Sequence, residues 1–212
     1  MNYIKSHTQM KKILLSLVLV ISVLCQNYGQ AMTGTPRQQP MPPRQEVKKY
    51  QYTIQNDIKY RDSQDPAYLN DRCQLDIYYP IDKENFQTLI WYHGGGLTGG
   101  KKEIPEDLKD NGFAIIGVGY RLSPDVTVAD CIDDAAAAAA WIVNHIEEYG
   151  GNPDAIYVSG HSAGGYLTNM IGLDKKYMAK YGQDPDEVFA GLIPFSGQVI
   201  THFTRRSEIG MT

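Results

Sequence analysis

The sequence is short of cysteine, shows little excess charge and contains no apolar run long enough to span a bilayer comfortably. Its net charge of −4 over 212 residues gives no reason to expect nucleic acid or an anionic membrane surface as a partner. Three cysteines are too few for a disulfide framework. We expect Cys73 and Cys131 to be free thiols in buried or half-buried positions, with a disulfide between them as the alternative. The remaining composition is that of an ordinary globular domain.

The N-terminal part of the chain differs in composition from the rest. Basic residues precede an apolar run over residues 13–24, which is shorter than the about 20 residues of a membrane span, and small residues follow it. This order predicts a signal peptide over residues 1–30 and a secreted or periplasmic protein with no stable membrane span after processing. An uncleaved membrane anchor is the alternative. Residues 31–48 are rich in Pro, Gln and Arg, which predicts a flexible linker to a domain over residues 49–212.

Hydrophobic patterns along this domain predict alternating strands and helices. Residues 50–54 and 74–78 alternate apolar or aromatic with polar side chains, which is typical of antiparallel strands at a sheet edge. Nearly continuous apolar runs predict strands covered on both faces at residues 88–92, 113–118, 155–158 and 189–193. Helical patterns between the runs, the clearest over residues 128–149, imply right-handed crossovers. The predicted fold class is α/β, with a mostly parallel, doubly wound sheet.

A serine at a predicted strand-to-helix turn is the strongest candidate for a catalytic residue. Gly160-His161-Ser162-Ala163-Gly164 matches the G-x-S-x-G pattern of a nucleophile elbow. Such a turn strains the backbone of the serine, and the flanking glycines remove side chains that would collide. The N–H of Ala163, at the start of the following helix, would point to the oxygen of an oxyanion. A plain glycine-rich turn is the alternative, since glycine and serine are common.

A second glycine motif directly follows the strand predicted at residues 88–92. His93-Gly94-Gly95-Gly96 can fold so that its N–H groups converge on one point, as an oxyanion site requires. Loss of one such donor typically costs about 2.7–4 kcal/mol of transition-state stabilisation. A flexible hairpin-like loop is the alternative. Because parallel strands end at the same edge of a sheet, we expect both glycine motifs to border one crevice.

Four stretches together resemble the α/β-hydrolase superfamily and, within it, bacterial carboxylesterases that carry an HGGG motif. They are WYHGGG, GVGYRLSP, GGNPDAIYVSGHSAGG and ADCIDDAAAAAAW, and the resemblance extends from about residue 75 to 197. It implies a serine hydrolase that cleaves carboxylic esters through an acyl-enzyme, with no metal or organic cofactor indicated. The implied site residues are the nucleophile Ser162, the oxyanion donors Gly94, Gly95 and Ala163, and His93 as organiser of the loop.

One position departs from part of this family and bears on the substrate. Members similar to hormone-sensitive lipase usually have Asp where this sequence has His161. The sequence is therefore closer to the acetylxylan and feruloyl esterases and the formamidases, which implies a short-chain or carbohydrate-linked acyl group. An amide hydrolase such as a formamidase or peptidase is one alternative. An inactive remnant or a binding module is another.

The acid and base of a catalytic triad are not evident in the sequence. In this fold the chain order is Ser, then Asp or Glu, then His, and His202 is the only histidine after Ser162. None of the acidic residues after Ser162 directly follows a predicted strand, so we expect His202 to line a pocket or lie on the surface. His202 as the base is the alternative. We expect the acid and base beyond Thr212, and the sheet to stop after about strand six, leaving an unpaired apolar edge.

The helix predicted over residues 128–149 carries further charged side chains. Asp133 and Asp134 are expected to form a supporting ion-pair network with Tyr120-Arg121, and a solvated helix face is the alternative. His145 is expected to be solvated.

Overall fold

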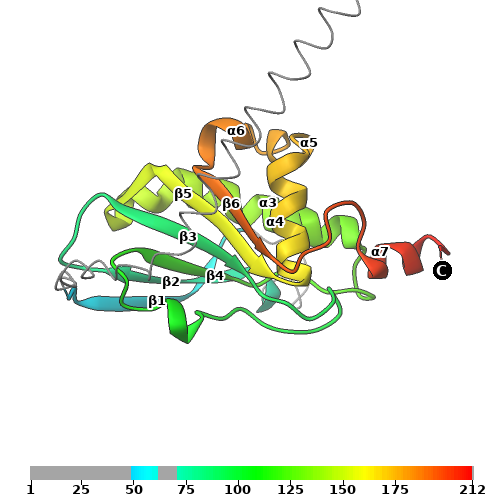
Figure 1. Cartoon of the computed structure of the whole chain (residues 1–212), viewed down its shortest axis with the longest axis horizontal. Coiled ribbons are helices and arrows are strands. Elements are labelled where there is room, and N and C mark those ends of the chain that lie inside the picture. Colours follow the sequence, from blue (N-terminus) through cyan, green and yellow to red (C-terminus); the bar gives the residue numbers. More distant parts are fainter. Residues whose placement is uncertain (1–48, 62–70, 212) are drawn as a thin grey trace, which may run out of the picture. The chain divides into compact units, whose positions relative to one another are not determined.

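A computed structural model describes residues 49–61 and 71–211 (Figure 1). The predicted signal peptide and linker lie outside these ranges. The strands are β1 (Tyr52–Lys59), β2 (Gln74–Pro80), β3 (Phe86–Tyr92), β4 (Ala114–Val118), β5 (Gly151–His161) and β6 (Gly191–Phe195). The helices are η1 (Glu106–Leu108), α3 (Val128–His145), η2 (Ile146–Tyr149), α4 (Ala163–Leu173), α5 (Lys176–Ala179), α6 (Pro185–Val188) and α7 (Phe203–Glu208). None of the described helices is long and apolar enough to cross a membrane.

The six strands form one mixed sheet in the order β1-β2-β4-β3-β5-β6. β2 pairs antiparallel with β1 and β4, whereas β4, β3, β5 and β6 run parallel. All of β4 is buried, as expected for a strand covered on both faces. The α/β fold class and the six predicted strands are confirmed. β5 is longer than predicted, because it already pairs with β3 at Gly151.

Helix α3 covers the sheet with a surface of small side chains. A reciprocal capping pair begins the helix: the Asp130 N–H donates to Thr127 Oγ1 (3.3 Å), and the Thr127 N–H donates to Asp130 Oδ2 (2.9 Å). Residues 135–140 are buried alanines, so the helix can lie close to the strands, behind them in Figure 1. The helix is shorter than the predicted residues 128–149. Its last turn tightens to the 3₁₀ helix η2, which Gly150 closes at φ 86°.

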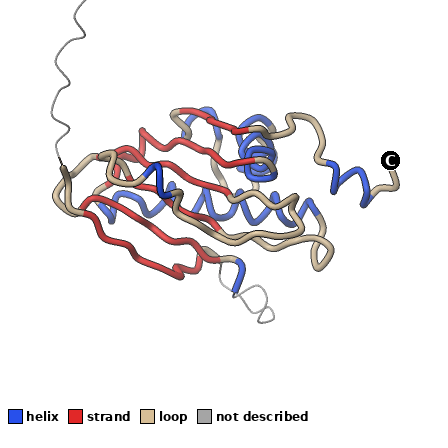
Figure 2. The backbone as a smooth tube through the Cα atoms, turned by 60° about the horizontal axis from the view of Figure 1, so that its bottom comes forward, coloured by secondary structure: helices blue, strands red, loops and turns tan. Residues whose placement is uncertain are grey.

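The two faces of the parallel strands differ in what covers them. Ile90, Val158 and Leu192 lie in one row across the sheet, and α4 packs on their face, where Gly172 lies against the Leu192 side chain. Figure 2 shows the helices in blue along the strands in red. Side chains at the alternate positions point to the other face. There the described residues leave a cavity of about 300 Å³, lined by Gln87, Thr88, Leu89, Leu108, Phe113, Tyr157, Ser159, Ile193 and Phe195.

Strand β6 is the last strand of the described sheet on its side. The side chains of Ile193 and Phe195 are 43% and 49% exposed. The expected apolar edge is therefore present within the described residues.

Candidate active site

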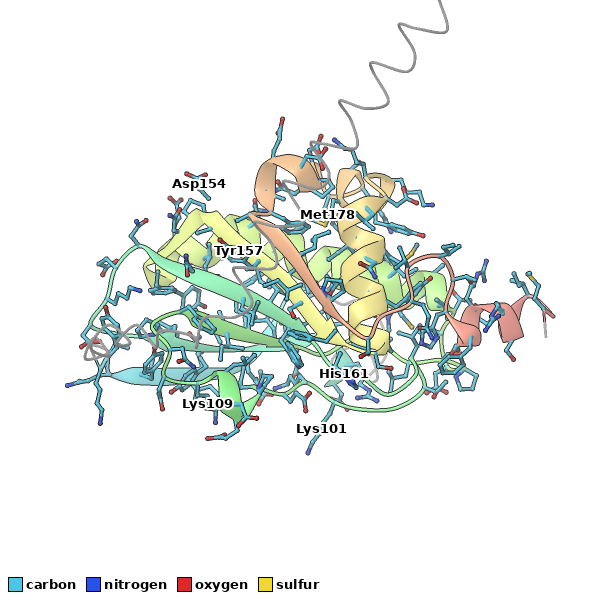
Figure 3. The ribbon with its side chains drawn as sticks, viewed as in Figure 1. Lys101, Lys109, Asp154, Tyr157, His161 and Met178 are labelled. Carbon is cyan, nitrogen blue, oxygen red and sulfur yellow. The ribbon has the colours of Figure 1, made fainter. Side chains whose placement is uncertain are left out.

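Two turns meet at the carboxyl ends of β3 and β5. These strands are parallel neighbours, with Tyr92 opposite Gly160. The glycine loop, which we define as residues 93–100, therefore begins beside the serine elbow, which we define as residues 160–165. Figure 3 labels His161 at this end of β5, next to the start of α4. The fold thus brings together two motifs that are far apart in the sequence.

The backbone of Gly94, in the glycine loop, lies beside the Ser162 side chain. A Cβ built on Gly94 would lie 3.7 Å from Ser162 Cβ and 3.1 Å from the His161 carbonyl oxygen. Within the described residues, no backbone hydrogen bond uses the N–H groups of Gly94, Gly95 or Ala163. These donors are free to bind a ligand oxygen, which an oxyanion site requires. Their catalytic role stays a prediction.

The backbone of Ser162 is strained. Its φ is 55° and its ψ is −111°, a conformation that costs a residue with a side chain on the order of 1–3 kcal/mol. Its N–H donates to the Phe195 carbonyl (2.8 Å), and its carbonyl accepts from the Tyr166 N–H (3.0 Å). Contacts with β6 and with α4 therefore fix the turn from two sides. This is the strand–turn–helix setting of a nucleophile elbow.

Glycine is required on both sides of Ser162 because the end of β3 passes close by. A Cβ on Gly160 would lie 2.5 Å from the Tyr92 carbonyl oxygen, and a Cβ on Gly164 would lie 1.9 Å from the same atom. Both distances are far below an ordinary van der Waals contact. The elbow glycines therefore let the turn pack against the neighbouring strand.

The glycine loop forms a tight turn. The Gly95 carbonyl accepts from the Gly99 N–H (3.0 Å). Gly95 has φ 114°, and a Cβ there would lie 2.2 Å from the Gly99 carbonyl oxygen. Gly100 has φ 95°, and its Cβ would lie 2.5 Å from His93 Nδ1 and from the Gly94 carbonyl oxygen. Gly100 is thus part of the loop packing, which the sequence analysis did not predict.

His93 joins the glycine loop to the core. It is 2% exposed, and its Nδ1 lies 2.6 Å from the Gly94 carbonyl oxygen. Because a carbonyl only accepts, Nδ1 must donate. The imidazole stacks on Tyr120 at 4.2 Å between centroids and 8° between planes, and the Tyr120 hydroxyl donates to the His93 carbonyl (2.7 Å). Burial lowers the pKa of His93, which favours the neutral ring.

Comparison with known proteins identifies the family of the chain. The family model BD-FAE matches residues 75–197, more than half of the chain. The chain belongs to the BD-FAE family. "Probable carboxylic ester hydrolase LipM" of Mycobacterium tuberculosis is 35% identical over 145 residues, which cover 63% of this chain and 33% of that protein. "Carboxylesterase NlhH" of the same species is 32% identical over 101 residues, 45% of this chain and 32% of that protein.

Solved structures support the fold. "Bacterial Heroin Esterase" matches with a TM-score of 0.56 and 26% identity over 69% of this chain and 45% of that chain. Esterase B from Lactobacillus rhamnosis (HN001) matches with a TM-score of 0.56 and 24% identity over 85% of this chain and 56% of that chain. This BD-FAE chain has the α/β-hydrolase fold that the sequence resemblance predicted. It spans about a third of the length of the two curated relatives and about half of these solved chains.

No imidazole of the described BD-FAE chain is hydrogen bonded to Ser162 Oγ. The expectation that His202 could lie on the surface is wrong, because the ring is fully buried. Its Nδ1 accepts from the Thr204 N–H (3.2 Å), so a neutral ring carries its proton on Nε2. Burial also lowers the pKa of His202. His145, expected to be solvated, is half-buried, with its ring stacked on Trp141 at 4.2 Å between centroids.

A C-terminal segment supports the glycine loop in a way that the sequence analysis missed. The Thr204 hydroxyl donates to the Gly96 carbonyl (2.6 Å), and a Cβ on Gly96, which has φ 68°, would lie 3.1 Å from the Phe203 ring. Glu208 Oε1 accepts from the Val128 N–H (2.7 Å) at the start of α3. Helix α7 therefore connects the loop with α3. No local pattern predicts a contact across 108 residues.

The predicted ion-pair network is present, and a solvated helix face is excluded for Asp134. That carboxylate is fully buried, and it accepts hydrogen bonds from the Arg121 N–H (3.0 Å) and Nε (2.8 Å). Arg61, from the end of β1, pairs with both Asp133 and Asp134. Tyr120 does not join the network through its hydroxyl, which bonds to the glycine loop instead.

The described region was expected to contain free thiols and no metal site. Within residues 49–61 and 71–211, no group of three or more His, Cys, Asp and Glu side chains could hold a metal ion. Cys73 and Cys131 are buried and free. Burial raises the pKa of Cys73 to about 11 and that of Cys131 to about 12, so both thiols stay protonated near neutral pH.

Proposed function

We propose that this protein hydrolyses carboxylic esters with Ser162 as the nucleophile. The observation that carries the proposal is the strained Ser162 backbone beside the free N–H groups of Gly94 and Ala163. The curated relatives are named as a carboxylic ester hydrolase and a carboxylesterase, which supports the same reaction class. The fold itself does not determine a reaction, so the proposal depends on these residues.

The proposed reaction passes through an acyl-enzyme. Ser162 Oγ attacks the acyl carbon, and the carbonyl π electrons move to the oxygen, which becomes an oxyanion. That oxyanion accepts hydrogen bonds from the N–H groups of Gly94, Gly95 and Ala163. The tetrahedral intermediate collapses, the carbon–oxygen bond to the alcohol breaks, and the alcohol leaves with a proton. Water then attacks the acyl-enzyme in the same way and releases the acid.

Proton transfer is the step that the described residues do not supply. A serine hydroxyl is a weak nucleophile unless a base accepts its proton, and none of the described imidazoles is hydrogen bonded to Ser162 Oγ. We propose that the acid and base of the triad come from outside the described residues. Oxyanion stabilisation and binding without the triad retain only about 10³–10⁴-fold catalysis over water.

We propose a short-chain or carbohydrate-linked acyl ester as the substrate class, since His161 is typical of that part of the resemblance. We also propose that residues 1–30 direct export and that residues 31–48 link them to the catalytic domain. N-terminal sequencing of the protein from a periplasmic or culture-medium fraction tests this. An intact Met1 on a cytosolic product would contradict export.

A fluorophosphonate probe and a chromogenic ester test the reaction. The protein, expressed from its gene to the natural stop codon, should hydrolyse p-nitrophenyl acetate and carry one phosphonate on Ser162. Ser162→Ala should abolish both, because loss of the nucleophile costs on the order of a million-fold in turnover. Tryptic mass spectrometry locates the adduct.

The same assay separates the alternatives. Faster hydrolysis of a p-nitroanilide than of the ester would indicate an amide hydrolase. A wild-type protein that neither reacts with the probe nor differs from Ser162→Ala would be an inactive remnant or a binding module. Among the described residues no imidazole is hydrogen bonded to Ser162 Oγ, and this observation favours the second candidate.

A further inference from the structure

We infer that Tyr120 is a positioning residue. Its hydroxyl and ring hold the glycine loop in the orientation in which the loop N–H groups can donate to an oxyanion. The inference rests on the proposed function of that loop. It assigns a role to a residue from the segment that follows β4, which neither contributes an oxyanion donor nor belongs to the serine elbow.

Tyr120 holds His93 through two separate contacts. Its hydroxyl donates to the His93 carbonyl (2.7 Å), and its ring lies flat on the imidazole, with the centroids 4.2 Å apart. Both side chains are buried, at 0% and 2% exposure, so water does not compete for these contacts. The His93 carbonyl belongs to the peptide unit that contains the Gly94 N–H. Tyr120 therefore acts on the plane of the first predicted oxyanion donor.

His93 extends this control by one more residue. Its Nδ1 donates to the Gly94 carbonyl, which belongs to the peptide unit of the Gly95 N–H. The Tyr120 stack fixes the imidazole that makes this bond. One tyrosine thus restrains two consecutive peptide planes, and with them both N–H groups that the loop offers to the site.

The segment that carries Tyr120 is itself fixed. The next residue, Arg121, donates its N–H and its guanidinium to Asp134, which is fully buried on α3. The preceding residue, Gly119, donates its N–H to the Gln74 carbonyl (2.8 Å) on β2. The tyrosine is therefore a rigid support, which is the condition for holding catalytic donors within a few tenths of an ångström of their working position.

Tyr92 provides a matched control. It is also fully buried, and its hydroxyl also donates to a backbone carbonyl at 2.7 Å, but that carbonyl belongs to Ala135 on α3. Burial raises the pKa of both phenols. Tyr120→Phe and Tyr92→Phe therefore remove hydrogen bonds of the same type, length and burial, and only one of the bonds reaches the glycine loop.

The test compares these two variants by ester kinetics and by hydrogen–deuterium exchange. Both should lose similar thermal stability. Tyr120→Phe should lower kcat for p-nitrophenyl acetate about tenfold, the effect of one mispositioned donor group, with less than a twofold change in KM. It should also speed amide exchange at Thr98 and Gly99, whose N–H groups donate to the Gly95 carbonyl (3.1 and 3.0 Å) and so report on the turn of the loop. The increase should be at least about fivefold relative to Tyr92→Phe, in line with the loss of one net hydrogen bond.

Two outcomes would overturn the inference. One is an equal loss of kcat in both variants that follows their melting temperatures. The other is unchanged exchange at Thr98 and Gly99 in Tyr120→Phe. The exchange measurement does not need turnover, so it still decides the role of Tyr120 if the wild-type protein proves inactive. Wild-type inactivity together with faster loop exchange in Tyr120→Phe would reject the proposed function and keep the positioning role.

Discussion

The serine elbow and the glycine loop lie side by side, yet different kinds of contact hold them. The elbow is fixed by backbone atoms: the Tyr92 carbonyl leaves no room for a Cβ at Gly160 or Gly164. The glycine loop also has close backbone approaches of its own, but its position depends on side chains, above all Tyr120 and Thr204. The elbow therefore depends on the absence of side chains near it, and the loop depends on the presence of side chains elsewhere.

This difference has a consequence for substitutions. At the elbow, almost any added atom meets backbone that cannot move, so a change is expected to unfold the region. At the loop, a supporting side chain can lose one hydrogen bond while the fold remains. The loop is thus the part of the site where function can change at nearly constant stability.

The strongest test of the comparison is Gly164→Ala. In a helix this change would ordinarily stabilise the protein by about 1 kcal/mol. Here the new Cβ would lie 1.9 Å from the Tyr92 carbonyl oxygen, so we expect the free energy of unfolding to fall by at least about 3 kcal/mol, the upper range for overpacking. Urea denaturation measures it. A neutral or stabilising effect would show that the elbow can yield, and the contrast with the loop would disappear.

A second test lies within the glycine loop, at Gly95 and Gly99. Gly95→Ala places a Cβ 2.2 Å from the Gly99 carbonyl oxygen at φ 114°, and we expect a loss of about 2–3 kcal/mol of stability. Gly99→Ala is the matched control, since its Cβ would meet only the Gly95 carbonyl oxygen at 3.8 Å. It should cost less than about 1 kcal/mol. Equal effects in the two variants would contradict the tight turn.

A third test uses the buried histidine of the loop. Burial lowers the pKa of His93 below its usual value of 6.5. Below pH 6.5 the imidazole is therefore protonated in the unfolded chain while it is still neutral in the folded protein. Stability is therefore lost as the pH falls from 6.5 toward the lowered folded pKa, by at most about 1.4 kcal/mol per pH unit for this group. Denaturation at pH 7.5 and 5.5 measures the loss. His93→Asn, whose amide can still donate at the Nδ1 position, should reduce it.

The smallest expected effect is on the stability of variants at Ser162, the proposed nucleophile, whose backbone is strained. Glycine adopts φ 55° without the cost of a side chain, so Ser162→Gly should be about 1 kcal/mol more stable than Ser162→Ala. Both variants lack the nucleophile, so the pair isolates the backbone term. Denaturation midpoints of the two proteins give the difference. A more stable alanine variant would mean that the elbow holds no strain.

The same contrast explains what the sequence allowed us to predict. The elbow is local, with five adjacent residues between an apolar run and a helix, so a short pattern was enough to find it. The supports of the glycine loop come from Tyr120 and Thr204, which lie 27 and 108 residues away from their partners. No motif around Tyr120 or Thr204 in the sequence indicates that its hydroxyl donates to a carbonyl of the glycine loop. Such pairings follow only from the order of the strands.

Burial of polar groups was also beyond the sequence patterns. His202 lies between two short segments without apolar periodicity, and the rings of Tyr166 and Phe203 pack around it in three dimensions. Arg61 follows an edge strand, where a solvated side chain is the usual expectation, yet it pairs with Asp134 on α3. The burial of His202 and the pairing of Arg61 both result from how helices pack in three dimensions. The residues next to them in the sequence do not indicate either. The six strands, by contrast, follow directly from hydrophobic runs.

The pairing register at the edge strand β6 bears on where a proton acceptor for Ser162 could be placed. The carbonyl of Phe195, its last residue, already holds the Ser162 N–H at 2.8 Å. Any segment that paired in parallel with β6 would lie two strand spacings, about 10 Å, from β5. The residues that follow it would enter the same edge of the sheet as the serine elbow. A slip of two residues moves their point of entry by about 6.6 Å, more than twice the span of a hydrogen bond. The alignment of one backbone, rather than the identity of any side chain, would then decide whether a proton acceptor comes within reach.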